Sequence, residues 1–188
     1  MCLSGVGQIV FGIIMTSCFI LTCVAMFSPN WRSFRDDTDD KMTTGLFKFN
    51  CKFPGTNEND STDRCGKDWW KHLHTWEKVT VVMMCLALAT ELLCLAWNLF
   101  ACFACCCKGI VIHPLTFFAV LVTLWLAIAV IVYGANTKDS LKDIDWGAKD
   151  APKTEIGYSF YMAVAALVLA LVDVVVASVT VFLAKKCC

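Results

Sequence analysis

Four stretches of this sequence are long and apolar enough to cross a lipid bilayer, and they constrain the fold more than any other feature. They run over about Val6–Phe27, Val79–Ala104, Ile110–Gly134 and Tyr158–Ala184. A spanning helix needs roughly 20 predominantly apolar residues. In hydrocarbon every backbone amide also needs an internal partner, which helices provide. The sequence therefore predicts a membrane all-α four-helix bundle.

The whole chain, residues 1–188, is expected to be a single four-span membrane domain. The first apolar window is predicted to be a retained span, because no Lys or Arg precedes it as in a signal peptide. Loops of about residues 28–78 and 135–157 then share one side of the membrane, and both termini lie on the other. The formal net charge is zero, so nothing points to a nucleic-acid partner.

Two sequence features disagree about which side is cytoplasmic. The two large loops hold 13 of the 16 basic residues, so the positive-inside rule would place them in the cytoplasm. However, the bases of the first loop are matched by acids, which suits a folded extramembrane domain. That loop also holds two cysteines, Cys51 and Cys65. Such a pair in an oxidising compartment forms a disulfide, so we expect these loops to be extracellular and the termini cytoplasmic. Two free thiols in a cytoplasmic loop are the alternative.

Six further cysteines lie beside lysines near the ends of predicted spans. Juxtamembrane cysteines next to basic residues are candidate S-palmitoylation sites. Cys102 and Cys105 also form a C-x-x-C pair, but the sequence offers no second ligand pair with zinc spacing, so we expect no metal and no cofactor. The candidate acylation sites are Cys102, Cys105, Cys106, Cys107, Cys187 and Cys188.

The first loop carries a combination of residues that resembles the claudin superfamily. Trp31 follows the first span, then come Gly45-Leu46-Phe47, Cys51 and Cys65. This pattern is similar to the W…G-L-W…C…C signature of claudins, peripheral-myelin-type proteins and stargazin-like subunits, with Phe47 in place of the second Trp. The resemblance covers the whole chain. It implies a small extracellular antiparallel β-sheet over the four-helix bundle, with Trp31, Gly45, Leu46 and Phe47 packing the sheet onto the membrane surface.

Two acids, Glu91 and Asp173, lie near the middle of predicted spans. A charge at the bilayer centre costs about 2.5–3.5 kcal/mol on insertion scales. Each acid belongs to a stripe of small or polar residues with 3-4 spacing, which traces one helix face and lets helices approach closely. We therefore expect both acids on helix-packing faces, bonded to each other, to Asn98 or to Thr180. A bond to a partner's helix is the sharper alternative.

The first loop has two further polar features. The acidic run Asp36, Asp37, Asp39 and Asp40 is either a solvated loop or a rim that attracts cations or basic partners. Asn59-Asp60-Ser61 is a candidate N-glycosylation sequon.

The segment before the second span carries Trp69, Leu73 and Trp76 at i, i+4 and i+7, which predicts an amphipathic helix at the membrane interface. Tyr133, Tyr158 and Tyr161 are expected to join this aromatic belt.

No catalytic constellation is present, so we expect no enzyme activity. Two functions remain from the resemblance. The first is a claudin-like component of plasma-membrane cell junctions, where the sheet meets copies of itself or other claudin-like proteins in cis and trans to form or regulate a paracellular barrier. The second is an auxiliary subunit that modulates the gating or trafficking of an ion channel or receptor. A myelin-type membrane organiser is a third reading.

Overall fold

The computed structural model describes residues 3–35, 41–47, 70, 73–103, 113–142 and 153–186. Four long helices run side by side: α1 (Leu3–Phe27), α4 (Thr75–Phe103), α6 (His113–Lys142) and α7 (Tyr158–Lys186). Each contains a stretch long and apolar enough to span a membrane. The prediction of a four-helix membrane bundle is confirmed.

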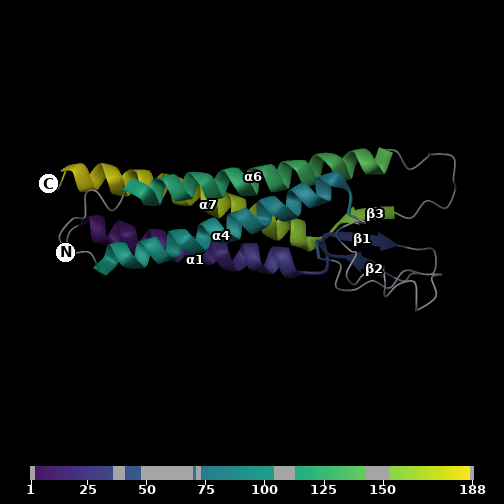
Figure 1. The fold of residues 1–188 in the computed structure, drawn as a ribbon, viewed down its shortest axis with the longest axis horizontal. Coiled ribbons are helices and arrows are strands. Elements are labelled where there is room, and N and C mark those ends of the chain that lie inside the picture. Colours follow the sequence, from purple (N-terminus) through teal and green to yellow (C-terminus); the bar gives the residue numbers. More distant parts are fainter. Residues whose placement is uncertain are drawn as a thin grey trace.

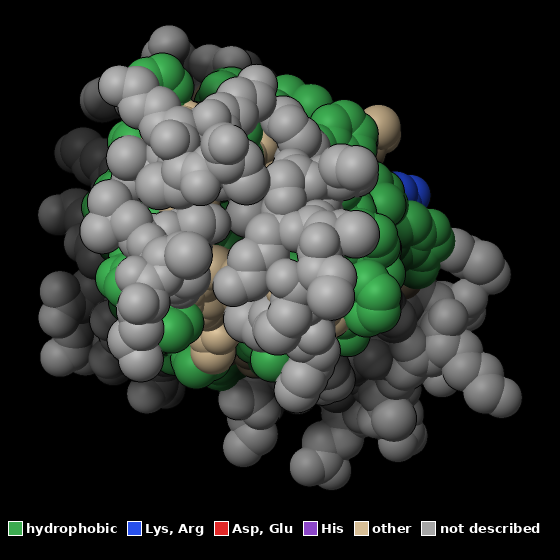
Figure 2. Space-filling view, turned by 90° about the vertical axis from the view of Figure 1, so that its left-hand side faces the viewer, with side chains coloured by type: hydrophobic (Ala, Val, Ile, Leu, Met, Phe, Trp, Pro, Cys, Tyr) green, Lys and Arg blue, Asp and Glu red, His purple; other side chains and the backbone are tan. Residues whose placement is uncertain are grey.

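The helices form a ring in which each contacts two neighbours. α1 packs against α7 and α4, and α6 packs against α4 and α7. The contact between α1 and α4 is the least extensive of the four. Seen from the end that carries the termini, hydrophobic side chains are visible along the top and right-hand rim of the bundle (Figure 2), and all four helices expose large hydrophobic residues. Such an apolar outer surface suits contact with lipid.

Three short strands lie at one end of the bundle, and both termini lie at the other (Figure 1). The strands are β1 (Arg32–Arg35), β2 (Lys41–Thr44) and β3 (Lys153–Ile156), in the order β2-β1-β3. Both pairings are antiparallel, and Arg32 lies opposite Thr44 on one side and Ile156 on the other. The extracellular location of this sheet stays a prediction.

The helix-packing faces use small and polar residues at 3-4 spacing. On α4 and α7 the predicted stripes are buried: Ala87, Glu91, Cys94, Asn98 and Ala101 on α4, and Ala163, Ala166, Ala170, Asp173, Ala177 and Thr180 on α7. On α1 the buried seam follows the same spacing through Phe11, Met15, Cys18, Thr22 and Ala25. Because lipid is as apolar as leucine, such close packing, rather than hydrophobic burial, holds membrane helices together.

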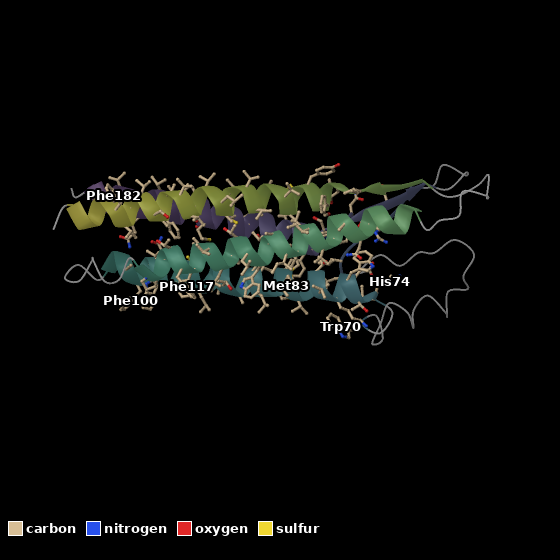
Figure 3. All side chains as sticks on the ribbon, turned by 90° about the horizontal axis from the view of Figure 1, so that it is seen from above. Trp70, His74, Met83, Phe100, Phe117 and Phe182 are labelled. Atoms are coloured by element: carbon tan, nitrogen blue, oxygen red, sulfur yellow. The ribbon has the colours of Figure 1, made fainter. Side chains whose placement is uncertain are left out.

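Two helix boundaries differ most from the predicted spans. α4 begins at Thr75, directly after His74 (Figure 3). The His74 amide donates to Glu77 Oε2 at 3.0 Å, which is the backbone-to-Glu half of a capping box and favours a helix start at this point. The predicted amphipathic helix through Trp69, Leu73 and Trp76 is not continuous: Trp70 is helical, residues 73 and 74 are not, and Trp76 belongs to α4. Trp69 lies outside the described residues. α6 continues past Gly134 to Lys142, because polar residues beyond the apolar span do not end a helix.

Candidate functional site: the sheet–bundle junction and the buried acids

Trp31 fastens the sheet to the helices. The chain leaves α1 at Phe27, and Trp31 then turns its indole back under the sheet, where it is 1% exposed. Its Nε1–H donates to the Ala25 carbonyl at 2.7 Å. That carbonyl lies in the last turn of α1, where carbonyls have no partner within the helix. Trp31 thus caps α1 and fixes the direction in which β1 begins.

An aromatic cluster surrounds the Trp31 ring. Tyr133 from α6 meets it edge-on with ring centroids 4.7 Å apart, and Phe160 from α7 does so at 6.4 Å. Trp76 from α4 contacts Tyr133 at 5.4 Å. The cluster therefore joins the sheet-side turns of α4, α6 and α7 to the C-terminal end of α1. Edge-to-face pairs of this kind are worth about 0.5–1.5 kcal/mol beyond their buried area.

Tyr133 was expected in an exposed interfacial belt, and this prediction is wrong. Its side chain is 2% exposed, because it lies between Trp31, Trp76 and Phe160 inside the junction. Tyr158 and Tyr161, by contrast, are exposed on α7.

Arg32 adds a cation to the same cluster. Its guanidinium carbon lies 4.6 Å from the centroid of Trp76 and 5.7 Å from that of Tyr133. Its Nε and Nη2 atoms are buried without a hydrogen-bond partner among the described residues. They border a cavity of about 20 Å³ that Glu77 also lines, which is room for about one water molecule. Arg32 thus ties β1 to the first turn of α4 through cation–π contacts.

The Gly45-Leu46-Phe47 segment lies against the loop that leaves α1. Leu46 is buried in the main core with Trp31. The ring of Phe47 stacks on Phe27 at the end of α1, with centroids 5.8 Å apart. A Cβ on Gly45 would lie 2.8 Å from the Pro29 Cα, so only glycine fits this approach.

Inside the bundle, Glu91 is bonded from the opposite helix. It is fully buried, and its Oε1 lies 2.9 Å from Thr22 Oγ1 and 3.3 Å from Cys18 Sγ, both on α1. The Cys18 thiol is equally 3.3 Å from the Ala166 carbonyl of α7. Glu91 Oε2 has no partner among the described residues. The Glu91 carboxyl group is therefore hydrogen-bonded to α1, and not to its expected partners Asn98 or Thr180.

Asp173 is also fully buried, but neither of its carboxyl oxygens has a hydrogen-bond partner among the described residues. Thr180, one of its expected partners, donates instead to the Val176 carbonyl of its own helix at 2.7 Å. Since both acids face the interior of the bundle, neither reaches the lipid-facing surface where a partner's helix would lie.

A comparison with protein families places the whole chain in one family. The family model described as "Tight junction protein, Claudin-like" matches residues 1–188. The chain belongs to this claudin-like family. A search of curated proteins found no match.

Several predicted sites of this claudin-like chain lie outside the described residues. Cys102 lies in the last turn of α4, and its side chain is outside the described part of the structure. Within the described part of the chain, no group of three or more His, Cys, Asp or Glu residues is placed to hold a metal. The predicted sites outside it are Asp36, Asp37, Asp39, Asp40, Cys51, Asn59, Cys65, Cys105, Cys106, Cys107, Cys187 and Cys188.

Sequence reasoning missed Cys18, Thr22, Arg32 and the role of Tyr133. The first two had a signal: they are polar or polarizable residues four apart in an otherwise apolar span, and so lie on one helix face. The sequence carried no such signal for Arg32 and Tyr133, because their contact depends on how β1 crosses the sheet-side ends of α4 and α6.

Proposed function

We propose that this claudin-like protein is a non-catalytic component of plasma-membrane cell junctions. Its sheet faces the extracellular space and meets copies of itself or other claudin-like proteins, and both termini are cytoplasmic. In this role it forms or regulates a paracellular barrier through adhesion.

The observation that supports the proposal is that the sheet is attached to all four helices of the bundle through Trp31 and Arg32. An adhesive surface must keep its orientation relative to the membrane when a neighbour pulls on it. Here the Trp31 indole is bonded to the end of α1 and packed against α6 and α7, and Arg32 of β1 lies on Trp76 of α4. All four helices thus hold one strand. The sheet is also at the end of the bundle away from both termini (Figure 1), as a contact with an opposing membrane requires.

The test is contact enrichment in non-adherent cells that express the full-length chain with a fluorescent protein. Two differently coloured populations are mixed, and fluorescence is compared at contacts between two expressing cells and at contacts with non-expressing cells. We expect enrichment only where both cells express the chain. Trp31→Ala should remove the enrichment, whereas Phe117→Ala, at a lipid-facing ring that is 61% exposed, should keep it.

Surface biotinylation must show that each variant reaches the plasma membrane. If the wild-type chain stays diffuse at contacts and instead co-purifies from native membranes with an ion channel or receptor, the auxiliary-subunit role replaces the junction role. Labelling of Cys51 and Cys65 with an impermeant thiol reagent, after reduction of intact cells, tests the orientation independently. Labelling only after the membrane is opened would reverse it.

A further inference from the structure

The cavity of about 20 Å³ at the sheet–bundle junction lies between β1 and the first turn of α4. Its apolar walls include Trp31, Leu46 and Leu73, which are all buried. Two charged side chains, Arg32 of β1 and Glu77 of α4, line it as well. A single water molecule needs roughly 10–15 Å³ of cavity space. The cavity is therefore large enough for one small occupant and no more.

Arg32 supplies the donors that such an occupant meets. Its Nε and Nη2 atoms are buried, and neither has a hydrogen-bond partner among the described residues, Glu77 included. The contacts of Arg32 with Trp76 and Tyr133 are cation–π contacts, which use the charge of the guanidinium group and leave its N–H groups unsatisfied. The Nε–H and one Nη2–H lie along the same edge of the rigid guanidinium fork, so one acceptor can receive both. Burial of charged donors without an acceptor is strongly unfavourable.

Glu77 supplies the acceptor of the cavity. Its Oε2 accepts the His74 amide at 3.0 Å, which holds the carboxylate at the start of α4. An ionised carboxylate has about four lone-pair sites, so this bond leaves capacity for a further donor. An occupant of the cavity thus meets hydrogen-bond donors from β1 and an acceptor from α4.

We propose that the cavity binds one water molecule, which bridges Arg32 to Glu77. The water oxygen accepts from Arg32 Nε and Nη2, and the water donates one proton to the Glu77 carboxylate. These three partners satisfy a buried water, which makes about 2–4 hydrogen bonds.

The charges and the size of the cavity select water over other small occupants. A halide ion would face the Glu77 carboxylate, and an alkali cation would face the Arg32 guanidinium, so both would be repelled from one side. A larger polar molecule exceeds the volume. The result is a hydrated ion pair that holds β1 at a defined position on α4, whatever the sheet itself binds.

The direct test is a crystal structure of the full-length chain grown in a lipidic mesophase, with bromide in place of chloride and at a resolution that shows ordered water. We expect one density peak within about 2.7–3.2 Å of Arg32 and of the Glu77 carboxylate, without anomalous signal at the bromine edge. A bromine signal in the cavity would assign it to an anion and overturn the proposal. A cavity without density, or a direct Arg32–Glu77 contact that closes it, would overturn the proposal as well.

A double-mutant cycle tests the bridge in solution, by SDS unfolding of the purified chain in mixed micelles. Arg32→Met removes the charge and the donors and keeps a long side chain, whereas Glu77→Gln removes the charge and keeps an acceptor for the His74 amide. We expect Glu77→Gln to raise the unfolding equilibrium constant about 3- to 10-fold in the wild-type chain, and by less than about 2-fold when Arg32→Met is also present.

Lys78→Gln is the matched control, because it changes a charge on the same turn of α4 but does not line the cavity. Its effect should agree within about 2-fold with and without Arg32→Met. An equal effect of Glu77→Gln in both backgrounds would show that cation–π contacts alone hold Arg32, and the bridge would be wrong. If Arg32→Met does not fold, the wild-type crystal structure still decides the matter.

Discussion

The bond between α1 and Glu91 can be tested with Thr22→Val, which replaces a hydroxyl by a methyl of similar size and so creates no cavity. Without the Thr22 hydroxyl, the fully buried Glu91 Oε1 keeps only the Cys18 thiol as a hydrogen-bonding neighbour among the described residues. Removing one partner of a buried acceptor costs about 1–3 kcal/mol, and hydrogen bonds measured within membrane proteins average about 0.6 kcal/mol with a maximum near 1.7. The Thr22 hydroxyl also lies 3.0 Å from the Cys18 carbonyl, so its proton is shared between two acceptors. We therefore expect a loss of about 1 kcal/mol in the free energy of unfolding, near the middle of the range for membrane proteins.

The measurement is an SDS titration in mixed micelles, followed by circular dichroism and analysed as a two-state transition. Thr90→Val is the matched control, because Thr90 bonds only the Leu86 carbonyl of its own helix at 2.7 Å; it should change stability by less than about 0.5 kcal/mol. In a Glu91→Met background the Thr22 substitution should have almost no further effect, which gives a coupling energy of about 1 kcal/mol. A loss no larger than that of Thr90→Val, or the same loss with and without Glu91, would refute the reasoning.

Three further predictions use the same titration. Asp173→Val should be neutral or stabilising, because it removes two buried oxygens that have no hydrogen-bond partner within the described part of the chain; a loss above about 1 kcal/mol would show that the carboxyl group is satisfied. Trp31→Phe keeps an aromatic ring but leaves the Ala25 carbonyl without its donor, so it should cost about 1–3 kcal/mol; an unchanged midpoint would contradict the capping role. Gly157→Ala places a Cβ against the Asn30 carbonyl oxygen in the loop before β1 and should cost about 1–3 kcal/mol. Gly134 lies inside α6, and a Cβ there would meet only the Phe160 ring of α7, at an ordinary contact distance of 3.4 Å. Gly134→Ala should therefore be neutral or stabilising by up to about 1 kcal/mol; equal losses for the two glycines would exclude the steric explanation.

The helices and their packing faces could be read from the sequence because both depend on local spacing. A run of apolar residues fixes a span, and a 3-4 repeat of small residues such as Ala163, Ala166 and Ala170 fixes the face that is buried. The ends of the helices were less predictable. The capping box of His74 and Glu77 begins α4 before its apolar stretch, and α6 continues through residues that carry no apolar signal.

The partners of the buried groups could not be predicted, since they depend on the register between helices. Glu91 was expected to bond residues on its own or the fourth span, yet Thr22 comes from the first. Tyrosine is a residue type that favours the membrane interface, yet Tyr133 is enclosed, because Trp31 from the loop after α1 and Trp76 from α4 both pack against its ring. The spacing of small and polar residues along one helix predicts which face is buried. It does not predict which residues of two neighbouring helices contact each other.

The two buried acids differ in what they do for the bundle, and the difference follows from where the packing is weakest. Glycines of α1 allow close approach on both sides: a Cβ on Gly7 would lie 2.5 Å from Thr180 Oγ1 of α7, and a Cβ on Gly12 would lie 2.5 Å from Asn98 Nδ2 of α4. The α1–α4 contact is the least extensive, and there the Thr22–Glu91 bond crosses the interface. Because lipid gives no hydrophobic drive to bring helices together, the bonds that Thr22 and Cys18 of α1 make to this buried carboxyl help to fix the position of α1 along α4. Asp173 has no such bond among the described residues, so its removal should leave the register of the bundle unchanged.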